Sequence, residues 1–222
     1  PPRPSLILLF VLPLSLSLSL SLSLSLSLDA YTKRSLYSYV HSSDLDASVR
    51  RQRLVAQLSM ADADIILLQE VDRECFKFVR DYFAAAFGLE CLFEPRPSRH
   101  EGCAVLFSKS KFEMRQPTVF TLSSAEQRVS PAVLLREKIT GRFLVVTSVH
   151  LSGSPELVRK GAPLQELAAA RQQCAQLIEA CNVPRDCAVL MAGDTNCEPN
   201  SPFYQKMQTE LGLCSAAAGH EP

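Results

Sequence analysis

Apolar residues between positions 43 and 212 follow two alternating patterns, continuous runs and helically spaced positions. Continuous runs bounded by polar residues predict buried strands near residues 64–70, 91–94, 103–108, 143–151 and 187–192. Apolar positions three and four residues apart predict helices over residues 43–59, 72–88, 163–181 and 201–212. Strands that alternate with helices in this way indicate an α/β domain with helices packed outside a mixed sheet.

Residues with capping preferences mark the ends of these predicted helices. Ser43 stands where the N-cap of the first helix is expected, and Ser201, followed by Pro202, stands at the start of the last. Gly88 occupies the C-cap position of the second helix, where glycine adopts the left-handed conformation easily. The helix over residues 163–181 is expected to be the longest, because Ala, Leu and Gln favour helix. One face of the second helix should carry Phe76, Val79, Phe83 and Ala86.

The first 28 residues do not follow either pattern. PPRPSLILLFVLPL precedes a low-complexity tract of alternating Ser and Leu. The composition leaves open a disordered tail, a membrane or targeting segment, and an ordered strand with one apolar face. We expect residues 1–28 to form a separate disordered or targeting segment and residues 29–222 to form the domain. Membrane association is expected only if the N-terminal segment is a genuine part of the protein.

Composition limits the class of protein more than its partners. A chain of 222 residues, 47% of them hydrophobic, is long enough for one large domain with a substantial core. Basic and acidic residues both number 23, so the net charge predicts no polyanionic partner, although a local basic patch is compatible with it. The eight cysteines include no CxxC pair and indicate reduced thiols in an intracellular protein, cytoplasmic or, alternatively, mitochondrial.

Polar side chains end three of the predicted strands. Glu70 ends the first, His150 lies near the end of the fourth, and Asp194 and Asn196 follow the fifth. Residues two apart in extended backbone point the same way, so Asp194 and Asn196 can converge. Loops beyond strand ends commonly bind ligands in α/β proteins, and an all-oxygen set suits Mg²⁺ better than Zn²⁺.

Each of these residues also has a purely structural interpretation. Glu70 could cap or border the following helix, because acidic residues favour helix N-termini. His150 could be a hydrogen-bonded structural histidine. Gly193, Asp194 and Asn196 could form an ordinary polar turn. The pattern alone leaves these alternatives open, since the order of the strands in the sheet is not given by the sequence.

Three motifs at these strand ends carry a family resemblance: ADIILLQEV (63–71), TSVHL (147–151) and GDTN (193–196). In this order they resemble the endonuclease/exonuclease/phosphatase superfamily of Mg²⁺-dependent phosphodiesterases. Further stretches resemble its branch of poly(A) deadenylases and 2′,5′-phosphodiesterases: LYSYV (36–40), RRQRL (50–54), FGLECLF (87–93), HEGCAVLFSKSKF (100–112) and EPNSPFY (198–204).

The resemblance implies a fold and a set of roles. The fold is a four-layer α/β/β/α sandwich of two mixed sheets, incomplete in this chain, with the active site at one rim. Glu70 resembles the principal Mg²⁺ ligand, and Asp194 resembles the catalytic acid/base that also faces the metal, which could be Mn²⁺ instead. Asn196 resembles the residue that orients the phosphate or the metal, and His150 the one that stabilises the scissile phosphate.

The expected activity is Mg²⁺-dependent hydrolysis of RNA 3′ ends or 2′,5′-oligoadenylate, with RNA or oligoadenylate as substrate and no stable protein partner. Two departures from the family pattern bear on it. The Ser/Leu tract replaces an opening strand that ends in Asn, and a closing Ser-Asp-His motif is not found, since His220 lacks the preceding Asp. A tyrosyl-DNA phosphodiesterase and a catalytically inactive RNA-binding or scaffold fragment therefore stay as alternatives.

Basic residues and one loop are further candidates for substrate contacts. The segment over residues 152–163 follows His150 and could be a substrate loop or an ordinary surface loop. Basic side chains that could contact phosphates, or be merely solvated, are Arg96, Arg99, Arg159, Lys160 and Arg171.

Overall fold

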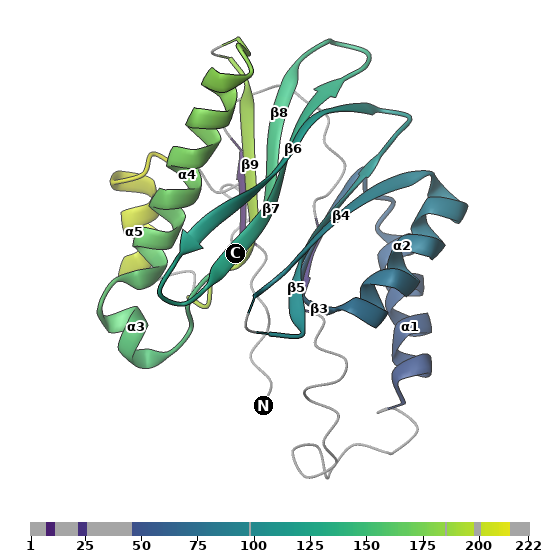
Figure 1. The fold of residues 1–222 in the computed structure, drawn as a ribbon, viewed down its shortest axis with the longest axis horizontal. Coiled ribbons are helices and arrows are strands. Elements are labelled where there is room, and N and C mark those ends of the chain that lie inside the picture. Colours follow the sequence, from purple (N-terminus) through teal and green to yellow (C-terminus); the bar gives the residue numbers. More distant parts are fainter. Residues whose placement is uncertain are drawn as a thin grey trace.

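Two β-sheets pack face to face and carry helices on both outer sides (Figure 1). The computed structural model describes residues 8–11, 22–25, 46–97, 99–184, 186–197 and 201–213. The expected four-layer α/β/β/α sandwich is therefore confirmed.

The elements follow one another along the chain as strands and helices of ordinary length. The strands are β1 Leu8–Val11, β2 Leu22–Ser25, β3 Ile65–Asp72, β4 Leu89–Pro95, β5 Glu101–Ser108, β6 Phe112–Ser123, β7 Arg128–Glu137, β8 Phe143–His150 and β9 Ala188–Asp194. The helices are α1 Ala47–Met60, α2 Arg73–Phe87, α3 Pro155–Arg159, α4 Ala162–Ala180 and α5 Pro202–Thr209.

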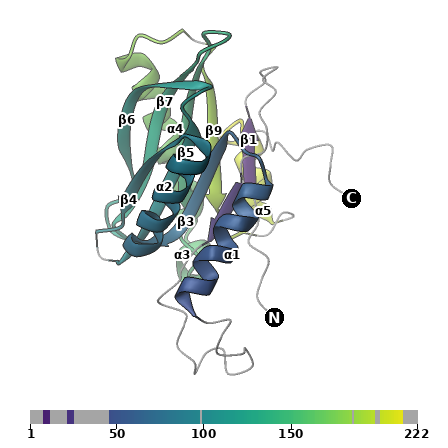
Figure 2. The same cartoon turned by 90° about the vertical axis from the view of Figure 1, so that its right-hand side faces the viewer.

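Both sheets are mixed. The five-stranded sheet has the order β1-β9-β8-β7-β6, and only the β8–β9 pair in it is parallel. The four-stranded sheet has the order β2-β3-β5-β4, and only the β2–β3 pair in it is parallel. Helices α1 and α2 cover the four-stranded sheet, and α4 and α5 cover the other (Figures 1 and 2).

Three apolar clusters fill the spaces between the four layers. The central cluster joins the two sheets through residues such as Leu67, Val105, Val146 and Leu190. The outer clusters place α2 and α4 against their sheets, with Phe83 and Leu167 almost fully buried. Central strands such as β3, β5 and β8 are thus covered on both faces, which is why their sequences read as continuous apolar runs.

Most predicted helix ends are confirmed. Gly88 is the C-cap of α2 with φ 64°, Ser201 caps α5, and Pro202 is its first residue. Helix α4, with 19 residues, is the longest in the described part of the chain. On α2, Val79 and Phe83 are buried and Phe76 is half-buried, as expected. Ala86 is exposed, and Cys75 takes the remaining buried position.

Two expectations need correction. The N-cap of α1 is Asp46, whose Oδ1 accepts hydrogen bonds from the backbone N–H groups of Ser48 (2.8 Å) and Val49 (3.2 Å). Ser43 lies outside the described residues. Residues 112–137 contain the long antiparallel pair β6–β7, which the apolar pattern did not predict. Strand β6 is an edge strand with many exposed residues, so it lacks a continuous apolar run.

The Ser/Leu-rich N-terminal segment contributes two short strands. Strand β1 pairs antiparallel with β9, with Leu8 opposite Gly193, and β2 pairs parallel with β3, with Leu22 opposite Ile66. These pairings are what the ordered-strand alternative predicts for residues 8–11 and 22–25. The division of the chain at residue 28 stays a prediction.

The described part of the chain contains free cysteines and no helix that could span a membrane. The seven described cysteines are free thiols, and Cys75, Cys103, Cys174 and Cys187 among them are buried. The intracellular location stays a prediction. No helix within the described ranges combines the length and apolar character needed to cross a membrane.

Candidate active site

Parallel pairing of β8 with β9 brings two of the predicted site residues together. His150 stands opposite Asp194 at the carboxyl ends of these strands. The backbones approach so closely here that a Cβ at Gly193 would lie 1.8 Å from the carbonyl oxygen of Val149. Only glycine fits before Asp194, and the GDTN motif therefore belongs to the packing of the strand as well as to the site.

Glu70 reaches the same place from the other sheet because β3 is irregular. The pairing of β3 with β5 shifts register between Leu68 and Val71, which is a β-bulge. Within it Glu70 has φ 53°, a left-handed conformation that is uncommon for a residue other than glycine. Leu68 and Val71 both face the α1–α2 layer. The bulge therefore resets the alternation of side chains and frees Glu70 to face the rim.

A buried hydrogen bond joins the two sheets directly beside this bulge. Gln69 Nε2 donates to Ser148 Oγ at 2.8 Å, and Ser148 Oγ donates to the carbonyl oxygen of Leu68 at 3.0 Å. Both polar side chains are almost fully buried. Because buried polar groups are costly when unpaired, this bridge fixes the end of β3 against the end of β8.

The imidazole of His150 lies close to both carboxylates. Its Nε2 is 3.8 Å from Glu70 Oε1 and 4.0 Å from Asp194 Oδ2. The three side chains keep 17–22% of their surface exposed, so a substrate can reach them. The structure thus brings together three residues that lie far apart in the sequence, and their chemical roles stay predictions.

Asn196 completes the group through a turn after β9. Its backbone N–H donates to Asp194 Oδ1 at 2.8 Å, and its Nδ2 donates to the carbonyl oxygen of Leu151 at 2.8 Å. Asn196 has φ 53°, which asparagine tolerates better than most residues. The polar-turn interpretation of GDTN is correct as geometry, and the same turn holds Asn196 beside Asp194 and Leu151.

Glu70 borders helix α2, as its structural interpretation allows, but it does not cap that helix. The N-cap of α2 is Asp72, whose Oδ1 accepts from the backbone N–H of Cys75 at 2.7 Å. Within the described part of the chain, neither ring nitrogen of His150 takes part in a hydrogen bond. Burial lowers the pKa of His150 to about 4, with Arg128 and Arg96 acting in the same direction and Asp194 opposing them. His150 is therefore a neutral imidazole at neutral pH.

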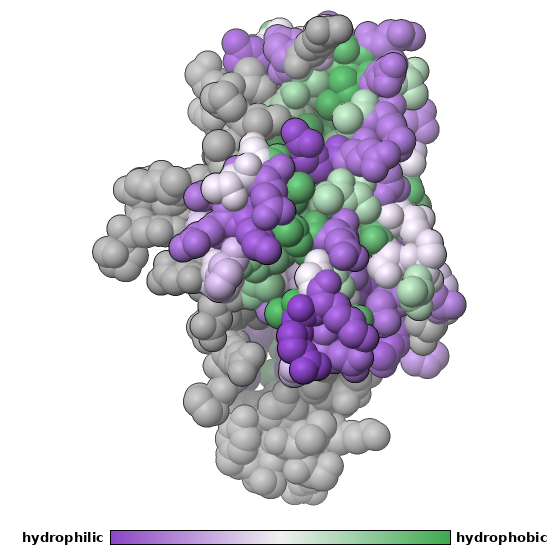
Figure 3. Space-filling view, turned by 90° about the vertical axis from the view of Figure 1, so that its left-hand side faces the viewer, coloured by the Kyte–Doolittle hydropathy of each residue, from purple (hydrophilic) through white to green (hydrophobic). Residues whose placement is uncertain are grey.

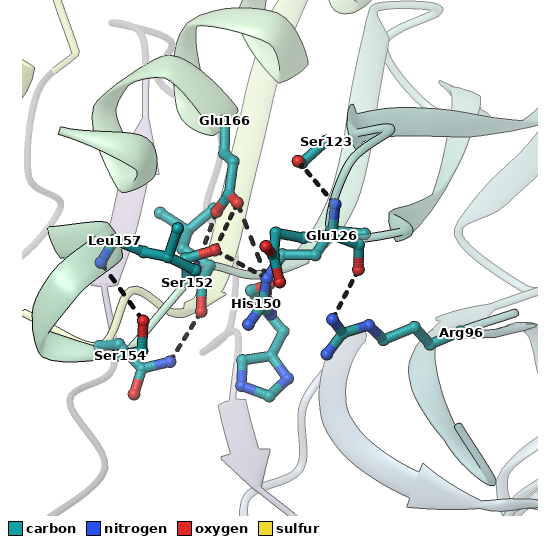
Figure 4. Close-up of polar contacts among 11 residues, drawn as sticks. Arg96, Ser123, Glu126, His150, Ser152, Ser154, Leu157 and Glu166 are labelled. Carbon is teal, nitrogen blue, oxygen red and sulfur yellow. Dashed lines mark hydrogen bonds and ion pairs between the residues drawn. The ribbon is translucent and has the colours of Figure 1, made fainter. Parts of the chain in front are cut away.

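A buried ionic network supports the segment that follows His150 (Figure 4). Arg128 donates from Nη1 to the carbonyl oxygen of His150 (2.8 Å) and from Nε to Ser152 Oγ (2.9 Å). Glu166 accepts from the backbone N–H of Ser152 (2.8 Å) and from its Oγ (2.5 Å), and lies 3.7 Å from Arg128. Sequence analysis missed Arg128 and Glu166, because isolated charges give no signal until the fold brings them together.

Arg96 approaches His150 from the other side of this segment (Figure 4). Its Nη2 donates to the carbonyl oxygen of Glu126 at 2.6 Å, while its buried Nε has no hydrogen-bond partner among the described residues. A cavity of about 20 Å³ is lined by Arg96, Arg128 and His150, together with Glu101 and Cys103. Burial and the nearby Arg128 lower the pKa of Arg96, as expected for two close cations. Two arginines and one glutamate, Glu101, therefore line the cavity beside the imidazole.

The other basic candidates lie at different places. Arg159 borders a groove that includes Asn196, and Lys160 instead forms an exposed ion pair with Glu156 at 2.6 Å. Arg99 and Arg171 are exposed. Of the segment over residues 152–163, residues Pro155–Arg159 form helix α3, and Gly153 packs against Asn196.

A comparison with models of protein families identifies the family of this chain. The model of the endonuclease/exonuclease/phosphatase family matches residues 34–221, most of the chain. The chain belongs to the endonuclease/exonuclease/phosphatase family. The resemblance stated from the three strand-end motifs is confirmed.

Relatives within the endonuclease/exonuclease/phosphatase family come from the expected branch. Protein angel homolog 2 of Bos taurus is 27% identical over 179 residues, which cover 76% of this chain and 32% of that protein. Human 2′,5′-phosphodiesterase 12 is 27% identical over 201 residues, covering 78% of this chain and 32% of its own length. The chain spans about a third of the length of these two relatives.

A solved structure shows the same fold. The crystal structure of ANGEL2, described as a 2′,3′-cyclic phosphatase and bound to adenosine-2′,3′-vanadate, superposes with a TM-score of 0.72 at 24% identity. The match covers 91% of this chain and 58% of that one. The endonuclease/exonuclease/phosphatase sandwich is therefore present over nearly the whole chain.

The donor set at the rim fits a hydrated magnesium ion better than a metal held by protein ligands alone. Glu70 and Asp194 supply carboxylates and Asn196 a carboxamide, which are oxygen ligands of the kind that Mg²⁺ takes while it keeps several waters. Within the described residues, no group of three or more His, Cys, Asp or Glu side chains has metal-binding spacing.

Gly153→Ala should disturb the site without unfolding the protein. A Cβ at Gly153 would lie 2.5 Å from Cγ and Oδ1 of Asn196, so the amide must move and lose its hydrogen bond to Leu151. Losing one such bond costs about 0.5–1.5 kcal/mol. We expect a raised KM with a small change in the free energy of unfolding, measured by steady-state kinetics and urea denaturation.

The matched control is Asn196→Ala, alone and combined with Gly153→Ala. If the glycine acts through Asn196, the double variant should have the KM of Asn196→Ala. Additive effects on KM would mean that Gly153 acts through another contact.

Proposed function

We propose that the chain is a Mg²⁺-dependent phosphodiesterase that hydrolyses 2′,5′-oligoadenylate or the 3′ end of RNA. The observation that carries this proposal is the meeting of His150, Glu70 and Asp194 at one rim, with Nε2 of the imidazole 3.8 and 4.0 Å from the two carboxylates. Support for the substrate class comes from relatives such as human 2′,5′-phosphodiesterase 12. Members of the family generally use divalent metals.

The side chains at the rim match the needs of phosphodiester hydrolysis. The attacking water must lose a proton, and Asp194 is a partly exposed carboxylate that can accept it. Negative charge gathers on the phosphoryl oxygens, and the neutral imidazole of His150 can donate a hydrogen bond to one of them. Held by Glu70 and Asp194, Mg²⁺ would polarise the phosphoryl group and lower the pKa of bound water.

The charged cavity beside His150 adds a reason to favour a phosphate ester. Arg96 and Arg128 both line it, and the guanidinium fork matches phosphate geometry. Arg128 is held in place by Glu166 and Ser152. Its side chain would therefore lose little conformational entropy when a substrate binds. The positive charge of the two arginines would favour a phosphate beside His150.

The decisive experiment compares substrates and metals with the same protein. We expect hydrolysis of 2′,5′-linked or 3′,5′-linked triadenylate in Mg²⁺, partial replacement of Mg²⁺ by Mn²⁺, and loss of turnover in excess EDTA. Product release is measured by anion-exchange chromatography. Restoration of turnover when Mg²⁺ is added back separates metal removal from damage to the protein.

Other outcomes favour the alternatives. Faster cleavage of a 5′-phosphotyrosyl oligonucleotide than of either triadenylate would support a tyrosyl-DNA phosphodiesterase. RNA binding without turnover, unchanged in Asp194→Ala, would support a non-catalytic RNA-binding protein. Hydrolysis that survives EDTA would contradict the proposed use of a metal.

A further inference from the structure

A groove with a volume of about 430 Å³ runs between helices α3 and α5 and the start of α4. Its apolar wall includes Val158, Leu164 and Phe203, and two cationic side chains, Arg159 and Lys206, stand at its border. This volume lies within the range of sites that take small ligands. Figure 3 views the side of the molecule that carries α4, where hydrophobic residues form a band between hydrophilic ones.

The groove is continuous with the candidate active site through Asn196. This residue lines the groove, and its backbone N–H donates to Asp194 Oδ1. Its side chain is bonded to the carbonyl oxygen of Leu151, the residue after His150. A ligand that fills the groove would therefore contact Asn196, the residue that is hydrogen-bonded to Asp194.

The two cationic side chains at the border of the groove are free to contact a ligand. Within the described part of the chain no Asp or Glu lines the groove, and neither Arg159 nor Lys206 forms an ion pair or a side-chain hydrogen bond. Both side chains are exposed. Lys160, next to Arg159, is instead bonded to Glu156 and does not line the groove. Two such cations beside an apolar wall suit a ligand that joins a flat apolar group to phosphate.

Phe203 gives the apolar wall an aromatic surface. The residue is half-buried, because it packs against the core beneath α4 and α5 and also lines the groove. Aromatic side chains bind nucleobases by stacking without much preference for the base. The combination of one aromatic ring with two cations therefore fits a nucleotide better than a purely apolar ligand.

We infer that this groove binds a further nucleotide of the substrate, beyond the two that the cleaved phosphate joins. Its base stacks on Phe203, and its phosphate contacts Arg159 and Lys206. This inference rests on the proposed function and adds a length requirement to it. Oligonucleotides long enough to enter the groove bind more tightly than a dinucleotide, which fills only the reaction centre.

The test measures binding apart from turnover. In an Asp194→Asn background, the Kd of fluorescently labelled 2′,5′-linked tetraadenylate is determined by anisotropy at several salt concentrations. Arg159→Gln combined with Lys206→Gln should raise the Kd and reduce the slope of log Kd against log salt by roughly 0.7 for each phosphate that the variant no longer binds. Phe203→Leu, which keeps an apolar side chain in the core, should raise the Kd about 5- to 150-fold.

Matched controls define the results that would overturn the inference. Lys160→Gln removes a neighbouring charge outside the groove and should leave the Kd and the salt slope unchanged. If the Arg159 and Lys206 variants bind tetraadenylate as tightly as their parent, the groove does not hold the substrate.

The same data separate this inference from the proposed function. Binding that depends on Arg159, Lys206 and Phe203 in a protein that never hydrolyses an oligoadenylate upholds the groove and contradicts the phosphodiesterase. Hydrolysis that is equally fast for all lengths, with binding insensitive to the groove variants, upholds the phosphodiesterase and contradicts the groove.

Discussion

Asp194→Asn is expected to lower the rate of oligoadenylate hydrolysis at least about 10²- to 10³-fold, the usual cost of removing one preorganised catalytic group. Asparagine keeps the size of the side chain and can still accept the hydrogen bond from the backbone N–H of Asn196. It cannot accept a proton from water or supply a negative charge to a cation. The rate loss should therefore come without a change in the thermal unfolding midpoint.

The control is Asp186→Asn, which makes the same chemical change beyond the opposite end of β9. Asp186 is exposed and precedes the strand, far along it from the rim. Its rate and unfolding midpoint should match those of the parent protein. Unaltered hydrolysis in Asp194→Asn would remove Asp194 from the reaction, and a large drop in the unfolding midpoint would show that its role is structural.

Arg128→Ala is expected to reduce the free energy of unfolding by about 3–5 kcal/mol, the cost of leaving a buried charge without its partner. The side chains of Arg128 and Glu166 are only 11% and 3% exposed. Removal of the guanidinium leaves the Glu166 carboxylate uncompensated and takes two hydrogen bonds from the segment after His150. Urea denaturation followed by circular dichroism measures the effect.

A double variant tests the physical reason for this loss. Arg128→Met combined with Glu166→Gln removes both charges, while the amide oxygen of Gln can still accept from the backbone N–H of Ser152. We expect it to be more stable than Arg128→Ala, because no buried charge is left unpaired. A cost of Arg128→Ala below about 1 kcal/mol would place the pair with ordinary surface ion pairs instead.

The apolar pattern predicted the main strands and helices, and the family resemblance supplied the four layers and the candidate residues at the rim. Long apolar runs identified β3, β8 and β9, and cap residues such as Gly88 and Ser201 fixed helix ends. These signals are local, and burial on both faces makes them strong. Strand β6 was missed because it lies at a sheet edge and is interrupted by Pro117 and by exposed polar residues.

The orientation of Glu70 could not be derived from the sequence. Strict alternation along β3 would place Glu70 on the same side as Leu68, toward the helices. The bulge that turns it to the rim follows from pairing with β5 and from the bridge between Gln69 and Ser148. Arg128 and Glu166 were missed for a similar reason, since their pairing exists only after β7 and α4 have packed around the same loop.

Because the bridge between Gln69 and Ser148 joins the two sheets, the proposed activity depends on how the sheets are held together. Glu70 comes from one sheet, whereas His150 and Asp194 come from the other, so the proposed reaction centre is shared by both halves of the molecule. Each half could keep its own strands and helices while the protein lacks catalytic activity. Substitutions that loosen the seam between the halves can thus abolish catalysis from positions that no substrate ever touches.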